Sequence, residues 1–425
     1  MKEYSYSQVI DFFENMPHFV PPKEGGAKKD YFSLDGELKL LEKLGRPQDK
    51  LKYVHIAGTN GKGSTTAYLA SILNEASVVT GAFTSPFLYR YNEMFRVNGQ
   101  DISDDDFAKV FSQVKPSYDE LASEGVAVSE YEFLTVMAFI YFISKECEIV
   151  LMEVSMGGRM DTTNVIPAPL VTIITPISYD HMTILGNTLT EIATEKAGII
   201  KPGTTVITAS QENEVALVLE DTCKKNLVEI YSGGSSELIS RSLKGQTFRV
   251  GERMYETSML GIYQLQNAAV AIRAAEELVK LGFCISEEAI KNGIKNTKWF
   301  GRFTVVNENP TIIVDGGHNR QGAAVLRESL EAYFPGKKIT FVLGILADKE
   351  VDIILDTLLP IADKCYTMAV PNSRTMDPGL LAEKIRSRGV EAVVLENGAN
   401  ISSLVDADSV ICVCGSLYLL QNVIY

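Results

Sequence analysis

The chain has 425 residues, of which 46% are hydrophobic and 22% are charged, and its formal net charge is −14. The length suggests two or three domains of roughly 150 residues each, and the composition is that of a globular protein with ample apolar material for a core. The negative charge disfavours partners such as nucleic acid and anionic membrane surfaces. The six cysteines have no zinc-type spacing.

The N-terminal twenty residues contain acids where a signal peptide would have its apolar segment, so we expect a cytoplasmic protein. The longest apolar stretch, FLTVMAFIYFI (133–143), is shorter than the roughly 20 residues that span a bilayer. It predicts a buried helix and no membrane segment. Cys412 and Cys414 lie in VICVCGSLYLL, which favours a core strand over a metal or redox site.

Apolar runs alternate with helical patterns along the chain, which predicts an α/β fold with a mainly parallel sheet. In chain order we expect a strand at 52–57, a helix at 64–76 with Ala67, Ala70, Leu73 and Ala76 on one face, strands at 148–154 and 170–177, and a helix at 267–282. The rhythm restarts with strands at 311–317 and 337–346, followed by EAVVLENG and SVICVCGS. We therefore divide the chain into domains 1–297 and 298–425.

Between the first strand and the first helix lies GTNGKGS (58–64), which departs from the usual phosphate-loop pattern G-x-x-x-x-G-K-[ST]. Gly63 follows Lys62, Ser64 comes one place late, and Ile56 stands where the first glycine would be. A strand, a glycine loop and a helix start still form the context that binds phosphate, because N–H groups and the helix dipole face the anion. The three glycines would permit close approach and unusual φ. A plain strand–helix turn is the alternative.

Seven further motifs accompany this loop, in a fixed order along nearly the whole chain. They are FTSPFLYRYNEMFRVNG (83–99), MEVSMGGRMDTTNVI (152–166), ISYDHMTILGNTLTEIATEKAGIIKPG (177–203), YQLQNAAVA (263–271), WFGRF (299–303), DGGHNRQG (315–322) and GSLYLL (415–420). Together with AGTNGKGST they resemble the folylpolyglutamate synthase/dihydrofolate synthase family, within the Mur ligase superfamily.

The resemblance implies a large N-terminal P-loop ATPase domain with a mainly parallel sheet (1–297) and a smaller C-terminal Rossmann-like α/β domain that handles glutamate (298–425). It implies an ATP-dependent ligase that joins L-glutamate to a folate through an acyl phosphate, extending tetrahydrofolate and also converting dihydropteroate to dihydrofolate. A dedicated dihydrofolate synthase and a non-catalytic ATP-binding switch are the alternatives. A peptidoglycan ligase is disfavoured, because Lys62 comes too early for a separate domain before it. The family's members are generally monomers.

The resemblance also assigns roles to single residues. The ATP-binding residues that it implies are Gly58, Thr59, Asn60, Gly61, Lys62, Gly63, Ser64, Asn267, Arg302 and Asp315. It implies a Mg²⁺ site formed by Ser85, Glu153 and His181, and catalytic roles for Lys62, Lys196 and His318. Lys196 is expected to be carbamylated, since the family's lysine at this place often is. Asp161 and Arg159 are the candidate substrate residues.

Without the family resemblance, each of these residues also has a simpler structural interpretation. Glu153 could pair with Arg159, His181 could be a structural hydrogen-bonding group, and Ser85 an ordinary turn serine. Lys196 could pair with Glu195 or Glu191 on a helix surface, and Asp161 could cap the turn that follows it.

The family's D-x-A-H-N-P becomes D-G-G-H-N-R here, with Gly317 and Arg320 as the departures. The pterin side is expected to involve 25–45, 129–135 and 158–164, and the stretch 28–31 is atypical for the family.

Overall fold

The computed structural model describes residues 2–17 and 33–423. Their contacts divide the chain into two compact units. The first holds the described residues of Met1–Ile177, His181–Gly233 and Val270–Gly293, and the second holds Ser178–Asp180, Gly234–Ala269 and the described part of Ile294–Tyr425. These units are defined by contacts within the structure. The predicted boundary near residue 298, between domains that would fold independently, stays a prediction.

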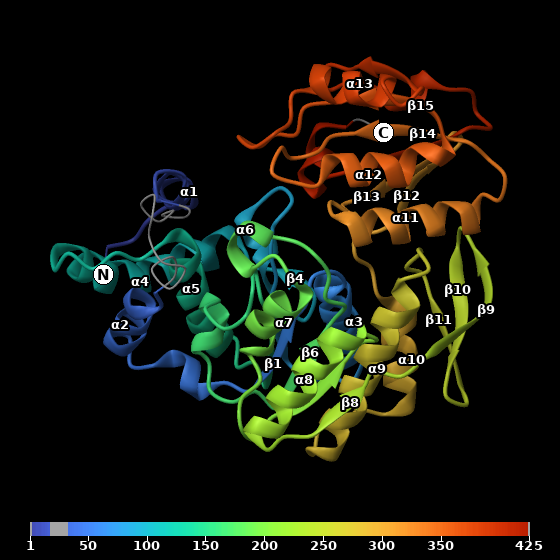
Figure 1. Ribbon diagram of the computed structural model, residues 1–425. Coiled ribbons are helices and arrows are strands. Elements are labelled where there is room, and N and C mark those ends of the chain that lie inside the picture. Colours follow the sequence, from blue (N-terminus) through green and yellow to red (C-terminus); the bar gives the residue numbers. More distant parts are fainter. Residues whose placement is uncertain (1, 18–32, 424–425) are drawn as a thin grey trace. The chain divides into compact units, whose positions relative to one another are not determined.

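The first unit is built on an eight-stranded sheet in the order β4-β3-β2-β5-β1-β6-β7-β8 (Figure 1). The six strands from β2 to β8 in this order are parallel, and β3 and β4 extend the β2 edge in antiparallel fashion. The strands are β1 (Tyr53–Ala57), β2 (Thr80–Phe83), β3 (Phe95–Val97), β4 (Gln100–Asp101), β5 (Ile149–Glu153), β6 (Val171–Ile174), β7 (Thr205–Thr208) and β8 (Ile230–Ser232). Every residue of β1, β2, β5 and β6 is buried, and for β5 and β6 this confirms the prediction from their continuous apolar runs.

Helices of the first unit flank this sheet (Figure 1). They are α1 (Tyr6–Glu14), α2 (Asp35–Lys43), α3 (Lys62–Glu75), α4 (Asp104–Ser123), α5 (Glu130–Ser144), α6 (Met182–Leu185), α7 (Leu189–Ala197) and α8 (Asn213–Asn226). Two further helices, α9 (Gln264–Lys280) and α10 (Glu287–Asn296), have their residues divided between the units. Short 3-10 turns include η2 (Pro47–Lys50), η3 (Tyr91–Met94) and η4 (Thr162–Val165).

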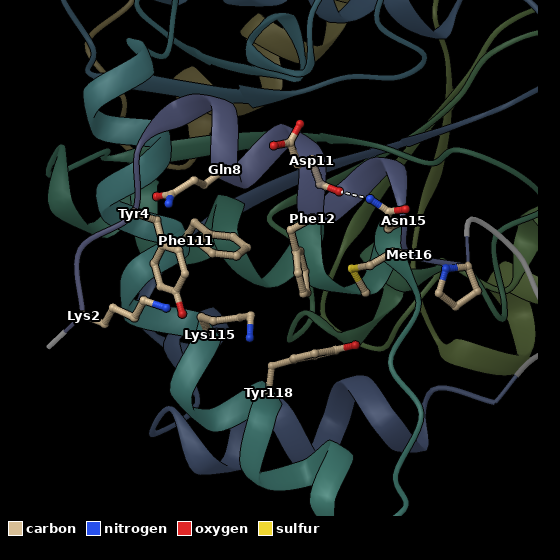
Figure 2. Close-up of a pocket in the computed structure, with 11 residues that line it drawn as sticks. Lys2, Tyr4, Gln8, Asp11, Phe12, Asn15, Met16, Phe111, Lys115 and Tyr118 are labelled. Atoms are coloured by element: carbon tan, nitrogen blue, oxygen red, sulfur yellow. Dashed lines mark hydrogen bonds between the residues drawn. The ribbon is translucent and has the colours of Figure 1, made fainter.

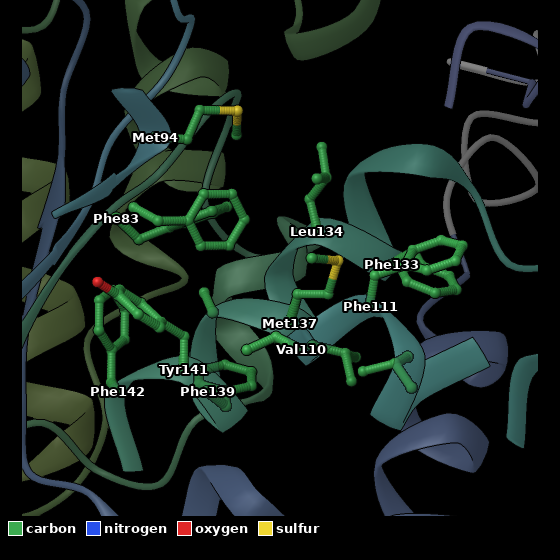
Figure 3. Packing of buried hydrophobic residues seen from close by; sticks show 14 of the residues in the cluster. Phe83, Met94, Val110, Phe111, Phe133, Leu134, Met137, Phe139, Tyr141 and Phe142 are labelled. Carbon is green, nitrogen blue, oxygen red and sulfur yellow. The ribbon is translucent and has the colours of Figure 1, made fainter. Parts of the chain in front are cut away.

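The predicted buried helix at 133–143 is confirmed as the central part of α5. Its side chains form a core with those of α4 and β2, in which Phe111 and Phe133 stack with ring centroids 5.4 Å apart (Figure 3). Ser129 caps the helix and Glu132 completes a reciprocal capping box. The N-terminal turn of α5 is therefore held firmly, which matters for the site below.

The second unit contains a six-stranded sheet in the order β12-β13-β17-β14-β15-β16, in which only the β12–β13 pair is antiparallel. Its strands are β12 (Thr304–Glu308), β13 (Thr311–Asp315), β14 (Ile339–Leu343), β15 (Ala362–Thr367), β16 (Glu391–Val394) and β17 (Val410–Cys414). Its helices are α11 (Arg320–Tyr333), α12 (Val351–Leu358) and α13 (Pro378–Arg386), with 3-10 turns η5 (Leu359–Ile361), η6 (Ile401–Leu404) and η7 (Leu417–Asn422). A separate antiparallel sheet comprises β9 (Ser236–Ser242), β10 (Gly245–Val250) and β11 (Arg253–Thr257).

Two details of the predicted helices are wrong. The helix expected at 64–76 begins at Lys62, and its most buried face carries Tyr68, Leu69 and Ile72, not the three alanines, because the larger side chains bury more apolar area. The helix expected from Asn267 begins at Gln264. The core-strand interpretation of VICVCGS is confirmed, since Cys412 and Cys414 are fully buried in β17.

Candidate active site

Four neighbouring parallel strands end at the same edge of the first unit's sheet, in the order β2-β5-β1-β6. Ser85 follows β2, Glu153 ends β5, the loop 58–64 follows β1, and His181 lies in the segment after β6. Glu153 pairs in register with Ile56, two residues before the loop. The fold therefore gathers segments that are up to about 120 residues apart at the edge where parallel sheets usually bind ligands.

The glycine loop is held by its own backbone. Gly58 has φ 146°, and a Cβ there would lie 1.9 Å from Oγ1 of Thr175, so only glycine fits. The N–H groups of Thr59 and Asn60 both donate to the carbonyl of Pro176, at 2.9 and 3.2 Å. Gly61, with φ 87°, is the N-cap of α3. Gly63, expected to have an unusual φ, lies within the helix instead.

Helix α3 begins within the loop motif, and the N–H of Thr65 donates to the carbonyl of Gly61 at 2.9 Å. Lys62, Gly63 and Ser64 thus form the opening turn, where the helix dipole presents positive charge. Because Ser64 is the third residue of the helix and is buried, the shifted G-K-G-S spacing still places its side chain at the helix start.

Two lysines converge on one carbonyl of the loop. Nζ of Lys62 donates to the carbonyls of Gly58 and Thr59 at 3.1 and 3.2 Å, and Nζ of Lys196 donates to Gly58 at 2.9 Å. Lys196 is only 4% exposed. The hydrogen bond from Lys196 to Gly58 thus joins the end of α7 to the loop, between residues 138 positions apart in the sequence.

The simpler partners suggested for Lys196 and Glu153 have other contacts. Glu195 pairs with Arg159, whose Nη2 lies 2.7 Å from Oε1 of the glutamate. Glu191 accepts hydrogen bonds at the N-terminus of α7, from Asn187 and Thr188. Glu153 is 4% exposed at the strand end, where a buried carboxylate requires a compensating donor or cation.

Tyr131, which is partly buried, lies beside Ser85. The hydroxyl of Tyr131, in the first turn of α5, donates to Oγ of Ser85 at 3.2 Å. Burial, and then the charges of Asp161 and Glu153, raise the pKa of Tyr131 well above its usual range. His181, in contrast, occupies the left-handed region with φ 50° as the N-cap residue of α6, which is uncommon for a residue with a Cβ.

The loop after Glu153 packs against the end of α7. A Cβ on Gly158 would lie 2.8 Å from the carbonyls of Glu195 and Lys196, so glycine permits this approach. The N–H of Arg159 also donates to the carbonyl of Glu195, at 2.8 Å. The segment 154–161 therefore sets where Lys196 lies.

Asp161 caps the 3-10 turn η4, as its simpler interpretation predicted. It accepts from the N–H and the hydroxyl of Thr163 at 3.0 and 2.6 Å, and from the N–H of Met156 at 2.9 Å. Nε2 of His55 lies 2.8 Å from the same hydroxyl. Burial, with a contribution from the charge of Lys201, lowers the pKa of His55 to about 3, so the imidazole is neutral at pH 7.

Sequence reasoning missed this line of contacts from His55 through Thr163 to Asp161. A signal was present, because a histidine inside the otherwise apolar strand 52–57 must find a polar partner when it is buried.

In the second unit, Asp315 ends β13 and is 3% exposed. It accepts from the hydroxyl of Tyr263 at 2.7 Å, from the N–H of Phe303 at 2.9 Å and from the N–H of Gly317 at 2.7 Å. Arg302 lies against the same turn, since a Cβ on Gly316 would be 2.3 Å from its Nη1.

Asn267 lies in the first turn of α9, where its side-chain amide donates to Gln264 at 2.9 Å. Asn267 is buried, and it belongs to the part of α9 that lies in the second unit.

His318 belongs to a polar cluster around Asp180, which is in the second unit. The Asp180 carboxylate lies 3.2 Å from Nε2 of His318, 3.1 Å from the amide of Asn319 and 2.6 Å from Nζ of Lys349. Lys349 and Asp180 each have side chains only 8% exposed. Lys349 was missed from the sequence, although it follows the predicted strand 337–346 in a polar loop.

Arg320, the departure from the family pattern, has partners within its unit. It pairs with Glu350, with Nε 2.9 Å from Oε2, and its guanidinium lies 4.5 Å from the ring centroid of Tyr179. These contacts explain its place without a ligand.

Other parts of the described chain do not add to the site. A pocket between α1 and α4 is lined by residues that include Tyr4, Phe12, Lys115 and Tyr118 (Figure 2). None of the predicted site residues lines it. Residues 2–17 and 33–423 contain no group of three or more His, Cys, Asp or Glu side chains suited to a metal ion. In the same residues no helix is long and apolar enough to cross a membrane. Of the predicted pterin segment 25–45, residues 25–32 lie outside the described residues.

A helix-capped glycine loop beside a buried carboxylate, at the carboxyl edge of a parallel sheet, defines an α/β enzyme of the nucleotide-binding class. Comparison with protein families narrows this class. Residues 56–275 match the Mur ligase middle domain, and residues 301–417 match the Mur ligase glutamate ligase domain.

Individual relatives match nearly the whole chain. The dihydrofolate synthase/folylpolyglutamate synthase of Bacillus subtilis is 36% identical over 406 residues, covering 91% of this chain and 93% of the relative. The Mycobacterium tuberculosis folylpolyglutamate synthase complexed with ADP and AMPPCP has a TM-score of 0.86 at 28% identity, covering 97% and 96% of the two chains. Escherichia coli FolC in complex with DHPP and ADP has a TM-score of 0.84 at 25% identity, covering 98% and 96%.

The chain belongs to the folylpolyglutamate synthase/dihydrofolate synthase family of Mur ligases. It is an ATP-dependent glutamate ligase of that type, with the family's fold. The predicted family, fold class and enzyme class are confirmed.

Proposed function

We propose that this enzyme adds L-glutamate to tetrahydrofolate or its glutamylated forms, and that it also converts dihydropteroate to dihydrofolate. The observation that carries the proposal is the convergence of Ser85, Glu153, the loop 58–64 and Lys196 at one sheet edge. A dedicated dihydrofolate synthase is the second candidate. An enzyme that adds one glutamate to dihydropteroate alone would need the same ATP-binding residues.

The loop binds the ATP phosphates in this proposal. N–H groups at the start of α3 face the β- and γ-phosphates, and Lys62 exchanges its contacts with Gly58 and Thr59 for phosphate oxygens. Asn267, Arg302 and Asp315 are further ATP-binding candidates, because the family's motifs imply these roles. Bidentate donors such as Arg302 suit phosphate oxygens.

Ser85, Glu153 and His181 would hold Mg²⁺. The residues fit, because Mg²⁺ bound with a nucleotide needs only one or two carboxylates and takes its other ligands from waters and phosphates. The buried position of Glu153 next to the loop supports this, since a cation offsets the cost of burying its charge. When bound, Mg²⁺ neutralises charge on the phosphate oxygens.

Lys196 becomes a carbamate in our proposal. Its neutral amine adds to CO₂, forming an N–C bond and releasing one proton, so that an anion replaces a cation. The position of Lys196 supports this, because its side chain is 4% exposed and its Nζ lies at the glycine loop, 2.9 Å from the carbonyl of Gly58. Gly158 would keep the modified side chain in place through its close approach to α7.

Catalysis proceeds in two steps. A carboxylate oxygen of the acceptor bonds to the γ-phosphorus of ATP as the bond to the β-phosphate oxygen breaks, giving an acyl phosphate and ADP. The amine of L-glutamate then bonds to the acyl carbon, inorganic phosphate leaves with the electron pair of the broken C–O bond, and the nitrogen loses a proton. His318 is the proposed group that assists in this second step.

The glutamate carboxylates require cations, and the polar cluster around Asp180 offers one. Lys349 is held there at 2.6 Å from Asp180, beside His318 and Asn319. We assign this cluster to glutamate recognition. Arg159 and Asp161 shape the acceptor side of the loop 154–161 in the first unit.

The test is ADP release with MgATP and L-glutamate, comparing dihydropteroate with tetrahydrofolate as acceptor. Turnover with both supports the full proposal, and turnover with dihydropteroate alone supports the dedicated synthase. Glu153→Gln is the inactive control, and Glu220→Gln, on an exposed face of α8, is the matched active control. No turnover with either acceptor refutes the proposal. A cytoplasmic location and a monomeric state stay predictions.

A further inference from the structure

One asparagine side chain joins the two segments of backbone that lie around Lys196. It is Asn164, in the 3-10 turn η4. The amide Nδ2 of Asn164 donates to the carbonyl of Arg159 at 3.0 Å and to the carbonyl of Gly198 at 3.2 Å. Arg159 lies in the loop after β5, and Gly198 is the C-cap residue of α7, the helix that carries Lys196. Asn164 therefore ties this loop to the end of the helix.

The orientation of the Asn164 amide follows from its neighbours. Both are carbonyl oxygens, which only accept hydrogen bonds, so the NH₂ end of the amide must face them. The other end, Oδ1, is buried and has no hydrogen-bond partner among the described residues. A buried polar atom without a partner destabilises a fold. What the side chain contributes therefore comes from the two hydrogen bonds of Nδ2.

The two segments that Asn164 joins also touch each other directly. A Cβ on Gly198 would lie 2.3 Å from Cβ of Arg159, so a side chain at this position would force the segments apart. The N–H of Arg159 donates to the carbonyl of Glu195 at 2.8 Å. Hydrogen bonds thus fix the backbone at residue 195 and at residue 198, on both sides of Lys196 in the sequence.

The turn that carries Asn164 is anchored as well. The N–H of Asn164 donates to the carbonyl of Asp161 at 2.8 Å, and Nζ of Lys201 donates to the carbonyl of Asn164 at 2.8 Å. Lys201 comes shortly after α7, so this bond is a second connection between η4 and the chain that follows the helix. A supporting side chain holds a functional group accurately only when its own position is fixed, and Asn164 meets this condition.

We propose that Asn164 is a positioning residue for the reaction, which holds the end of α7 so that the amine of Lys196 lies at the glycine loop. This inference rests on the proposed function, and in particular on the proposed role of Lys196. Nζ of Lys196 lies 2.9 Å from the carbonyl of Gly58. A misplacement of about 1 Å at a reacting group can lower a rate about a hundredfold, so the backbone that carries this lysine must be held accurately.

Two other roles for Asn164 make different predictions. A substrate contact is disfavoured, because Nδ2 already serves two carbonyls and Oδ1 is buried. A role in stability alone predicts a less stable enzyme whose folded molecules keep their rate. Asn226 provides the comparison, since its Nδ2 also donates to a backbone carbonyl, that of Thr222, at 2.9 Å. It ends α8, shortly before the start of β8, and so lies towards the opposite edge of the sheet from the site.

The experiment compares Asn164→Leu and Asn164→Asp with the matched control Asn226→Leu. Leucine and aspartate have about the size of asparagine and both lack the amide donor, so the second variant serves if the first does not fold. Steady-state ADP release gives kcat and KM, and thermal unfolding gives Tm. We expect both Asn164 variants to lower kcat about tenfold or more, with KM for dihydropteroate and tetrahydrofolate within about twofold of the wild type. Asn226→Leu should keep the wild-type kcat, whatever its Tm.

The second measurement does not require turnover. Acetic anhydride labels lysine amines that are accessible, and peptide mass spectrometry in CO₂-free buffer gives the rate for each lysine. Lys196 is 4% exposed, so we expect slow labelling in the wild type and in Asn226→Leu, and severalfold faster labelling in the Asn164 variants. In single-turnover reactions, Asn164→Leu combined with Lys196→Ala should be no slower than Lys196→Ala alone, because the effect of Asn164 passes through the lysine.

A lower kcat together with faster labelling of Lys196 supports the proposal. Unchanged kcat in folded Asn164 variants overturns it, and so does a change confined to KM for the acceptor or an additive loss in the double variant. Each of these results leaves the ligase function intact. A wild-type enzyme without any turnover refutes the proposed function instead, and the labelling rates still test whether Asn164 holds Lys196 in place.

Discussion

Thr163 occupies the centre of a buried line of contacts, so its hydroxyl group is the sharpest place to perturb the site. The hydroxyl donates to Oδ1 of Asp161 at 2.6 Å and lies 2.8 Å from Nε2 of His55. A hydroxyl has one hydrogen, which here goes to the carboxylate, so Nε2 must carry the hydrogen that it shares with Thr163. All three side chains are buried.

Thr163→Val nearly preserves the shape and removes only this chemistry. The lost hydrogen bond to a carboxylate contributes about 1.5–3 kcal/mol, and the His55 N–H that is left buried without a partner costs about 1–3 kcal/mol. We expect the free energy of unfolding to fall by about 3–5 kcal/mol. Thr163→Ser keeps the hydroxyl and loses one methyl group, which costs about 1 kcal/mol.

Equilibrium unfolding in urea, followed by circular dichroism, measures both variants, and ADP release measures their activity. The expected order of stability is wild type, then Thr163→Ser, then Thr163→Val. A double-mutant cycle with His55→Leu isolates the contact, because removing His55 should cost less once its partner is gone. The reasoning fails if the valine variant is as stable as the serine variant, or if the cycle shows no coupling.

Three further predictions concern the same unit. Glu153→Gln should abolish MgATP-dependent turnover with an unchanged circular dichroism spectrum, and retained turnover would remove the metal assignment. Lys196→Ala should lose most activity and regain part of it with short carboxylic acids, whereas a full-rate variant would rule out an essential carbamate, which mass spectrometry under CO₂ also tests. His55 has a folded pKa of about 3 against 6.5 for a free histidine, so the unfolded chain binds the proton first as the pH falls. Stability should therefore decline from pH 6.5 towards 3, by up to about 1.4 kcal/mol per pH unit from this group, and His55→Leu should show a shallower slope between pH 6.5 and 5 in urea titrations.

The ends of strands were predictable from the sequence because they follow from local patterns. A continuous apolar run predicts a buried strand, and a polar residue directly after it must lie at the sheet edge. Glu153 after 148–152 and Asp315 after 311–314 are of this kind, and both are buried at strand ends. Parallel strands then bring such residues together without further information.

Partners across long stretches of sequence could not be predicted in this way. The pairing of Lys349 with Asp180 joins residues 169 positions apart, and Arg159 pairs with Glu195, not with the nearer Glu153. Which charge meets which depends on distances of a few ångströms between elements, and periodicity does not contain them.

Glu37 shows what a closer reading of periodicity could have found. Glu37, Leu40, Leu41 and Leu44 have the spacing of one helix face, and the first three are fully buried. An acid inside an apolar stripe is unusual enough to flag, although the absence of a hydrogen bond to it requires coordinates.

The sign of the stability change on substitution separates two kinds of buried polar residue in the first unit. His181 and Glu37 adopt states that are disfavoured by themselves, His181 through its backbone at φ 50° and Glu37 through a buried carboxyl group without a hydrogen bond. Thr163 instead satisfies its neighbours, so removing its hydroxyl must weaken the fold. If Glu37→Met stabilises the enzyme while Thr163→Val destabilises it, burial of the Glu37 carboxyl group costs the fold stability and the Thr163 hydroxyl contributes to it, since two residues kept for stability would both lose it.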